Sequence, residues 1–207
     1  MPDNTEYMEK LRHDIYGIMA GLLEILNPDL LDHSKKVAKG VKVFAQVLGW
    51  PKHVVQRVYV GGLVHDLGYL AVRNQAHENW NSLEDETPEQ KNLQELHPVL
   101  GEAILRRARS FDKIRPIVRH HHEHYDGSGF PDGLSGKDIP AEARLVAIVD
   151  FFDRVTTARS DPTIMSMKEA ELILKEDAGI IYDPLMVPLF LEKVVPTGVL
   201  GPPAETD

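Results

Sequence analysis

Apolar residues recur at steps of three and four along most of the chain, which is the spacing of one face of an α-helix. In the opening stretch, residues 5–26, the spacing is carried by Met8, Leu11, Ile15, Ile18, Leu22 and Ile25. No stretch shows the strict alternation of a half-buried β-strand. The spacing therefore predicts an all-α fold, a helical bundle of roughly eight helices.

Proline and glycine mark where these helices begin and end. Beyond the opening helix, we expect helices over about 29–48, from Pro51 to "HDLG", from "HPVLG", from near Pro116, over 140–158, over 167–177 and over 184–195. Gly68 in "HDLG" is expected to be a left-handed C-cap, and the polar residues 73–90 a loop. The chain divides into an N-terminal helix (1–28), a main domain (29–195) and a flexible tail (196–207).

The chain has 207 residues, ten histidines, no cysteine and a formal net charge of −9. Without cysteine, a bound metal would need histidine and carboxylate ligands, and a cytoplasmic location is expected. The negative charge disfavours duplex nucleic acid as a partner. No stretch is long and apolar enough to cross a membrane. A phosphate-ester substrate would need local positive charge, which bound metal ions can provide.

Helix phase places several polar residues on apolar faces. His33 shares a face with Leu30 and Val37, and Asp29 lies one turn before it. His65 comes three residues after a glycine pair, Gly61-Gly62, that allows another backbone to approach closely. We therefore expect these side chains to point into the bundle.

The run "HHHEH" at 120–124 is divided by the same reasoning. Ile117 and Val118 set the inward face of the helix, so the residues four later, His121 and His122, are expected to point inward. The other two histidines of the run are expected in solvent: His120 and His124.

Asp150 is the only charged residue in "LVAIVDFF". A lone buried carboxylate is costly unless a cation or a proton satisfies it. Taken singly, an inward histidine is more often a hydrogen-bonded core residue than a ligand, and Asp150 could equally pair with an arginine. The coincidence favours a metal site, because one core is expected to receive side chains from four helices: His33, His65, Asp66, His121, His122 and Asp150. His97, at a helix start, is a candidate for the same site.

Several motifs in order resemble the HD-GYP family, the cyclic di-GMP phosphodiesterase branch of the HD metal-dependent phosphohydrolases. They are "HSKKVA", "HDLG", "LHPVLGEAIL", "HHEHYDGSGFPDGLSGKDIP" and "RLVAIVDFFDRVTTAR". The resemblance covers about residues 29–194 and implies a metal site at one end of a helical bundle.

The resemblance also implies roles for individual residues. The superfamily ligands fall on His33, His65, Asp66 and Asp150, and the HD-GYP ligands on His97, His121 and His122. Asp66 matches the carboxylate that bridges two metals, and with His65 forms the catalytic pair. Asp29 stands where some members hold a third metal. Two or three divalent ions, iron or manganese, would be bound, and a metal-bridging hydroxide would attack cyclic di-GMP.

Two departures from the family pattern remove positive charge around this site: Tyr69 replaces the usual lysine after the HD pair, and His124 replaces an arginine. A third, Phe130 in place of the "GYP" tyrosine, keeps the ring and loses its hydroxyl. Arg159 matches a phosphate-binding arginine, and Lys137 or Tyr69 is a further candidate for phosphate contact.

These departures leave alternatives open. The chain could be a degenerate module that binds cyclic di-GMP or a signalling partner without turnover, or a phosphohydrolase for another nucleotide. The loop 126–133 is either a pair of tight turns or, as in the family, a docking site for a diguanylate cyclase domain.

Overall fold

The computed structural model describes residues 17–18, 21–22, 24–25, 28–72, 95–157 and 164–201. Within these ranges the chain is helical and contains no strand, apart from one isolated bridge between Ala178 and Tyr182. The predicted all-α class is therefore confirmed. None of the helices in this part of the chain combines the length and apolar character that a membrane span requires.

The helices follow the predicted order closely. They are α2 (Pro28–Val47), α3 (Lys52–Val64), α4 (Tyr69–Val72), α6 (His97–Leu105), α7 (Arg115–His120), α8 (Ala141–Thr157), α9 (Met167–Glu176) and α10 (Met186–Leu189). Short 3-10 turns lie at Arg109–Phe111, Gly136–Asp138 and Val195–Thr197, and α10 continues as a π-helical turn at Phe190–Val194.

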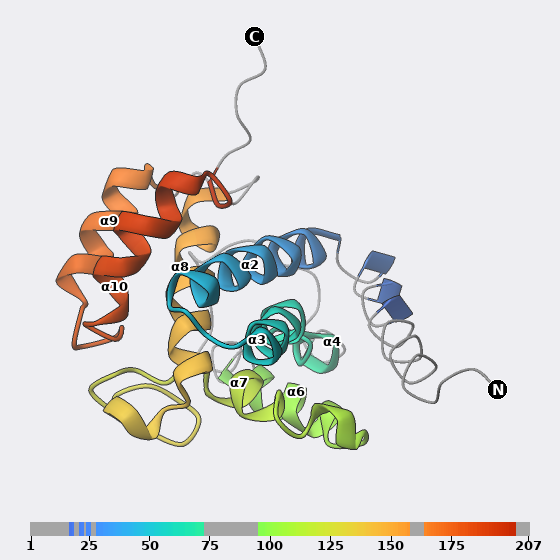
Figure 1. Cartoon of the computed structure of the whole chain (residues 1–207). Helices are drawn as coiled ribbons and strands as arrows, with labels where there is room; N and C mark the ends of the chain where they lie inside the picture. The colour runs from blue at the N-terminus through green and yellow to red at the C-terminus, as the bar shows by residue number, and fades with distance from the viewer. Residues whose placement is uncertain are drawn as a thin grey trace, which may run out of the picture.

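Helix α8 is the centre of the bundle. Figure 1 shows it between α9 and α10 on one side and α2 and α3 on the other. Its residues Leu145, Ile148 and Phe152 are fully buried and belong to one core cluster with Val41 and Phe44 of α2. Because α8 is covered on several sides, a polar residue on its inner face, such as Asp150, is held away from water.

The glycine pair before the HD residues brings α3 close to its neighbours, as predicted. A Cβ on Gly62 would lie 3.2 Å from the backbone Cα of Ala38 on α2, and one on Gly61 would lie 2.9 Å from side-chain atoms of Ile117 on α7. These contacts bring the C-terminal end of α3 against α2 and α7, where the other inward histidines lie.

The predicted left-handed C-cap at Gly68 is wrong. Gly68 is not among the glycines with positive φ, and α3 ends instead at Val64, with His65 as a right-handed C-cap at φ −57°. The glycine is needed for space, because a Cβ there would lie 1.9 Å from the carbonyl oxygen of His97 and 2.7 Å from the backbone nitrogen of Gly101. Gly68 thus lets the HD turn pack directly on α6.

Helix α7 is shorter than predicted. It ends at His120, with His121 as its C-cap, so His122 lies in the turn that follows. Only scattered residues of the predicted N-terminal helix are described; they are helical, with Ile18, Leu22 and Ile25 exposed. The loop 73–90 and the end of the tail, from 202, lie outside the described residues, and the domain boundaries stay predictions.

Candidate metal centre

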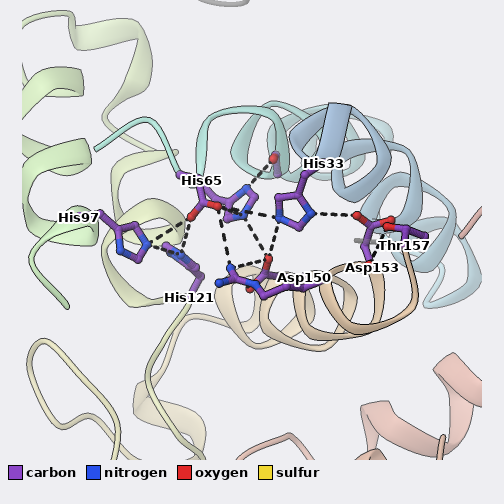
Figure 2. Close-up of polar contacts among 10 residues, drawn as sticks. His33, His65, His97, His121, Asp150, Asp153 and Thr157 are labelled. Atoms are coloured by element: carbon purple, nitrogen blue, oxygen red, sulfur yellow. Dashed lines mark hydrogen bonds and ion pairs between the residues drawn. The ribbon is translucent and has the colours of Figure 1, made fainter. Parts of the chain in front are cut away.

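Four side chains from three segments form a first group of candidate ligands. His33 of α2, His65 and Asp66 after α3, and Asp150 of α8 place one ligand atom each within 4.8 Å of one another. The Nε2 atom of His33 lies 2.9 Å from Oδ1 of Asp150, and Nε2 of His65 lies 3.2 Å from Oδ2 of Asp66. Figure 2 shows His33, His65 and Asp150 converging from the facing helices.

A second group shares one member with the first. Asp66, His97, His121 and His122 also place their ligand atoms within 4.8 Å of one another. Oδ1 of Asp66 lies 3.2 Å from Nε2 of His97 and 3.6 Å from Nε2 of His121, whereas Oδ2 faces His65. The carboxylate of Asp66 therefore stands between the two groups and presents one oxygen to each.

Hydrogen bonds behind the rings aim the histidine Nε2 atoms into the site. The Nδ1 atom of His65 donates to the carbonyl of Gly62 at 2.7 Å, and Nδ1 of His121 donates to the carbonyl of Val118 at 2.8 Å. When such a ring is neutral, its one proton is on Nδ1 and Nε2 presents a lone pair that a metal can bind. Such outer partners fix the tautomer and orientation of metal-binding histidines.

Two observations show that these residues fit a metal ion. Nε2 of His65 and Oδ1 of Asp66 are buried without a hydrogen-bond partner among the described residues. The Nε2 atoms of His97 and His121 lie 3.2 Å apart, and both lie within 3.6 Å of Oδ1 of Asp66, so three donor atoms converge on one point. Nitrogen and carboxylate donors without sulfur suit first-row divalent ions, so the cluster is able to bind metal.

The two buried carboxylates of the cluster are ionised. Burial lowers the pKa of His121 to about 4 and holds the pKa of His122 well below its usual value, so both rings are neutral at pH 7. Burial opposes protonation of His65, but Asp66 and Asp150 outweigh it and raise its pKa to about 10. Burial likewise opposes ionisation of Asp66 and Asp150, but their cationic neighbours keep the pKa of each carboxyl well below its usual value. Ionised buried carboxylates attract a positive ion.

Two aromatic rings pack against the outer histidines. The ring of Tyr69 stacks on His97 with centroids 3.9 Å apart, and Phe130 stacks on His122 at 5.0 Å. Phe130 belongs to the glycine-rich loop, so this loop borders the second group directly. Tyr69 is buried, and burial followed by the charge of Asp66 raises the pKa of its hydroxyl.

The remaining predicted site residues lie apart from these groups or outside the described chain. Asp29 is exposed in the first turn of α2 and is not in either group. Lys137 is exposed on the 3-10 turn Gly136–Asp138. Arg159 falls outside the described residues.

Sequence reasoning missed two residues of α8. Asp153 is buried, and its Oδ2 lies 2.8 Å from Nδ1 of His33; Arg154 lies 3.1 Å from both carboxylate oxygens of Asp150. Asp153 and Arg154 follow Asp150 by three and four residues, so helix spacing predicts that they share its face of α8.

Glu123 was missed as well. Its buried carboxylate accepts hydrogen bonds from the backbone N–H of Asp132 at 2.8 Å and of Leu134 at 3.0 Å. It thereby ties the glycine-rich loop to the turn that carries His121 and His122. No spacing rule signals this contact, because it depends on the path of the loop.

The expectation that His120 and His124 are solvated is wrong. The His120 side chain is only 13% exposed, with Nδ1 3.6 Å from Glu123 and 3.5 Å from Asp132; His124 is half-buried and lies 2.9 Å from the hydroxyl of Ser128. The loop folds back over the end of α7, so that its Asp132 lies beside His120 and its Ser128 beside His124. His120, Glu123 and Asp132 form a third group of possible metal ligands. Its carboxylates already have partners, because backbone N–H groups donate to Glu123 and Arg119 donates to Asp132 at 2.7 Å.

The chain belongs to the HD domain family, which matches residues 17–186. A solved structure from Bdellovibrio bacteriovorus, described as an HDG"Y"P protein, superposes with a TM-score of 0.63 and 26% sequence identity, over 77% of this chain and 50% of the other. The resemblance to the HD-GYP branch is confirmed.

Curated relatives include enzymes for two cyclic dinucleotides. The cyclic di-GMP phosphodiesterase response regulator RpfG of Xanthomonas campestris is 33% identical over 149 residues, 71% of this chain and 39% of its own length. The 3'3'-cGAMP-specific phosphodiesterase 1 of Vibrio cholerae is 29% identical over 168 residues, 78% of this chain and 37% of its own. The chain spans half or less of the length of the curated relatives it matches.

Proposed function

We propose that this chain is a metal-dependent phosphodiesterase that hydrolyses cyclic dinucleotides, with cyclic di-GMP as the preferred substrate. The observation that carries the proposal is the position of Asp66, whose two carboxylate oxygens face two separate groups of histidine and aspartate ligands. One carboxylate shared between two groups is the arrangement expected of a two-metal hydrolytic site. Relatives named as cyclic di-GMP and cGAMP phosphodiesterases support the substrate class.

The ligands would divide between two ions. His33, His65 and Asp150 would hold one, His97, His121 and His122 the other, and Asp66 would bridge them. Divalent ions at such a site supply a nucleophile from water near neutral pH and polarise the phosphoryl oxygens of a phosphodiester. Iron or manganese is the expected metal, since all donors are nitrogen or oxygen. Asp29, exposed at the start of α2, is the candidate ligand for a third ion.

Backbone carbonyls and side chains around the ligands hold this site in place. Gly62 and Val118 carbonyls fix two histidine tautomers, and Asp153 fixes His33. Phe130 and Tyr69 pack on the outer rings and limit the access of water to the second group. The expected result is a rigid site whose second ligand group is partly shielded from water.

A second candidate is a binding module without turnover. Tyr69 favours it, because a buried, neutral ring stacked on His97 stands where the family usually has a lysine. The two candidates predict the same metal site and differ in product formation.

Purified protein loaded with iron or manganese under reducing conditions should convert cyclic di-GMP to the linear dinucleotide or GMP, measured by liquid chromatography. Parallel reactions with 3'3'-cGAMP test the substrate preference. Asp66→Ala should abolish metal binding and turnover together. Two bound metals and measurable affinity for cyclic di-GMP, without product, would refute the enzyme and support the binding module.

A further inference from the structure

Arg154 lies on the same face of α8 as Asp150, one helical turn later. Its Nη2 atom is 3.1 Å from both carboxylate oxygens of Asp150 and 3.9 Å from Oδ2 of Asp66. The guanidinium therefore contacts the carboxylate that bridges the two ligand groups as well as one of its neighbours.

The arginine is much more open to solvent than the residues it contacts. Its side chain is 45% exposed, against 5% for Asp150 and 2% for Asp66. A guanidinium that served only to neutralise Asp150 would gain nothing from this exposure, and His33 and His65 already lie within 3.4 Å of that carboxylate. Arg154 thus stands at the rim of the cluster, between the buried ligands and solvent.

Arg154 is also the permanent positive charge of this region. Among the described residues, no lysine or other arginine lies within 4.0 Å of the carboxylates of Asp66 and Asp150. Arg154 hydrogen-bonds the hydroxyl of Tyr69, whose ring stacks on His97. This contact places the positive charge of Arg154 beside the neutral side chain of Tyr69. It also links α8 to the second ligand group through the Tyr69 ring that stacks on His97.

The chemistry of the group suits a phosphodiester. A guanidinium has five N–H donors in a planar fork that matches phosphate oxygens. The carboxylate contacts all use Nη2, so even with the hydrogen bond to the Tyr69 hydroxyl other N–H donors of the fork remain for a ligand. We propose that Arg154 binds a phosphate of the cyclic dinucleotide at the metal site, an inference that rests on the proposed function and names a substrate contact for it.

The test compares Arg154→Gln and Arg154→Lys with the wild-type protein, each loaded with manganese. Calorimetric titrations use inorganic phosphate and a phosphorothioate analogue of cyclic di-GMP, and metal content is counted by mass spectrometry. Losing one charge-assisted contact should weaken both affinities about ten- to a hundredfold in Arg154→Gln. Arg154→Lys should be intermediate, because lysine keeps the charge and loses the fork. Metal content should stay unchanged.

Lys175→Gln is the matched control, since it removes one positive charge from an exposed side chain on α9 paired only with Glu171 of the same helix in the described contacts. Unchanged affinities in Arg154→Gln, with lower metal content or melting temperature, would overturn the proposal and make Arg154 a counter-ion for Asp150. Weaker phosphate binding in Arg154→Gln, in a protein that never turns over a cyclic dinucleotide, would retain the phosphate contact and reject the proposed function. A wild-type protein that binds neither probe would refute both.

Discussion

The Nδ1 atom of His33 donates to Oδ2 of Asp153 across 2.8 Å, from α2 to the central helix α8. Nε2 of the same ring faces Asp150, 2.9 Å away. One imidazole thus connects an outer carboxylate to the first ligand group, and Asp153 fixes its orientation.

Asp153→Asn should lower metal affinity about ten- to a hundredfold, the usual effect of removing an outer carboxylate from a ligating histidine. The reason is loss of the charge that holds the His33 ring and raises its basicity. Competition with a fluorescent chelator measures the affinity. Asp138→Asn, on an exposed 3-10 turn, is the control and should bind metal as the wild type does. Equal affinity in both variants would mean that Asp153 does not orient His33.

Glu102 ties α6 to α7. It is buried and accepts hydrogen bonds from Arg106 of its own helix end and from Arg115 at 2.7 Å. The Arg106 hydrogen bond, helped by Arg115 and opposed by burial, lowers the pKa of Glu102 below 4.5. Glu102→Gln should reduce the free energy of unfolding by about 1–3 kcal/mol at pH 7.

The sign of the pH dependence follows from that lowered pKa. A carboxyl whose folded pKa lies below its unfolded value of 4.5 contributes its full stabilisation above pH 4.5 and loses it as the pH falls through the folded pKa. Urea denaturation should therefore show a constant gap between wild type and Glu102→Gln above pH 4.5, closing in acid. Glu171→Gln removes one partner of the Lys175–Glu171 ion pair on the surface of α9, and its free energy of unfolding should differ little from that of the wild type at any pH. A Glu102 gap that widens in acid would contradict the assignment.

Gly68→Ala should destabilise the protein by about 3 kcal/mol and lower its metal content. The added Cβ would meet the His97 carbonyl oxygen at 1.9 Å, so the turn carrying Asp66 and the helix carrying His97 would have to separate. Gly17→Ala is the control, because nothing lies within 4 Å of its Cβ position; it should be neutral or slightly stabilising. Thermal unfolding and metal content are measured on both variants. A Gly68→Ala protein with wild-type melting temperature and metal content would refute the close approach of the HD turn to α6.

Glu123→Gln should loosen the glycine-rich loop. The amide can accept only one of the two backbone hydrogen bonds, from Asp132 and Leu134, so one buried donor loses its partner at a cost of about 1–3 kcal/mol. Hydrogen exchange should quicken at these two amides and leave α9 unaffected. Unaltered exchange at both would show that Glu123 does not hold the loop.

Helix phase predicted correctly that most of these side chains point inward. His33, His65 and Asp150 lie on or at the end of long, regular helices, α2, α3 and α8, where the 3.6-residue period fixes the direction of each side chain. His121 and His122 also point inward, but for another reason: α7 ends at His120, and the turn after it directs them.

The contacts that sequence alone did not predict join segments far apart in the chain. Gly68 is needed because α6 packs on the HD turn, and Glu123 matters because the loop returns to it nine and eleven residues later. Periodicity describes a single helix and carries no information about which backbone approaches which. Arg154 is a different case, because it follows Asp150 by four residues and helix spacing alone predicts that the two side chains share a face.

Anomalous diffraction from crystals of the manganese-loaded protein tests the central claim most directly, that Asp66 joins two metal positions. We expect two anomalous peaks, one on each side of the Asp66 carboxylate. The first should lie within ligand distance of His33, His65 and Asp150, and the second within ligand distance of His97, His121 and His122. A single peak that leaves either group without metal, or peaks only at His120, Glu123 and Asp132, would contradict it.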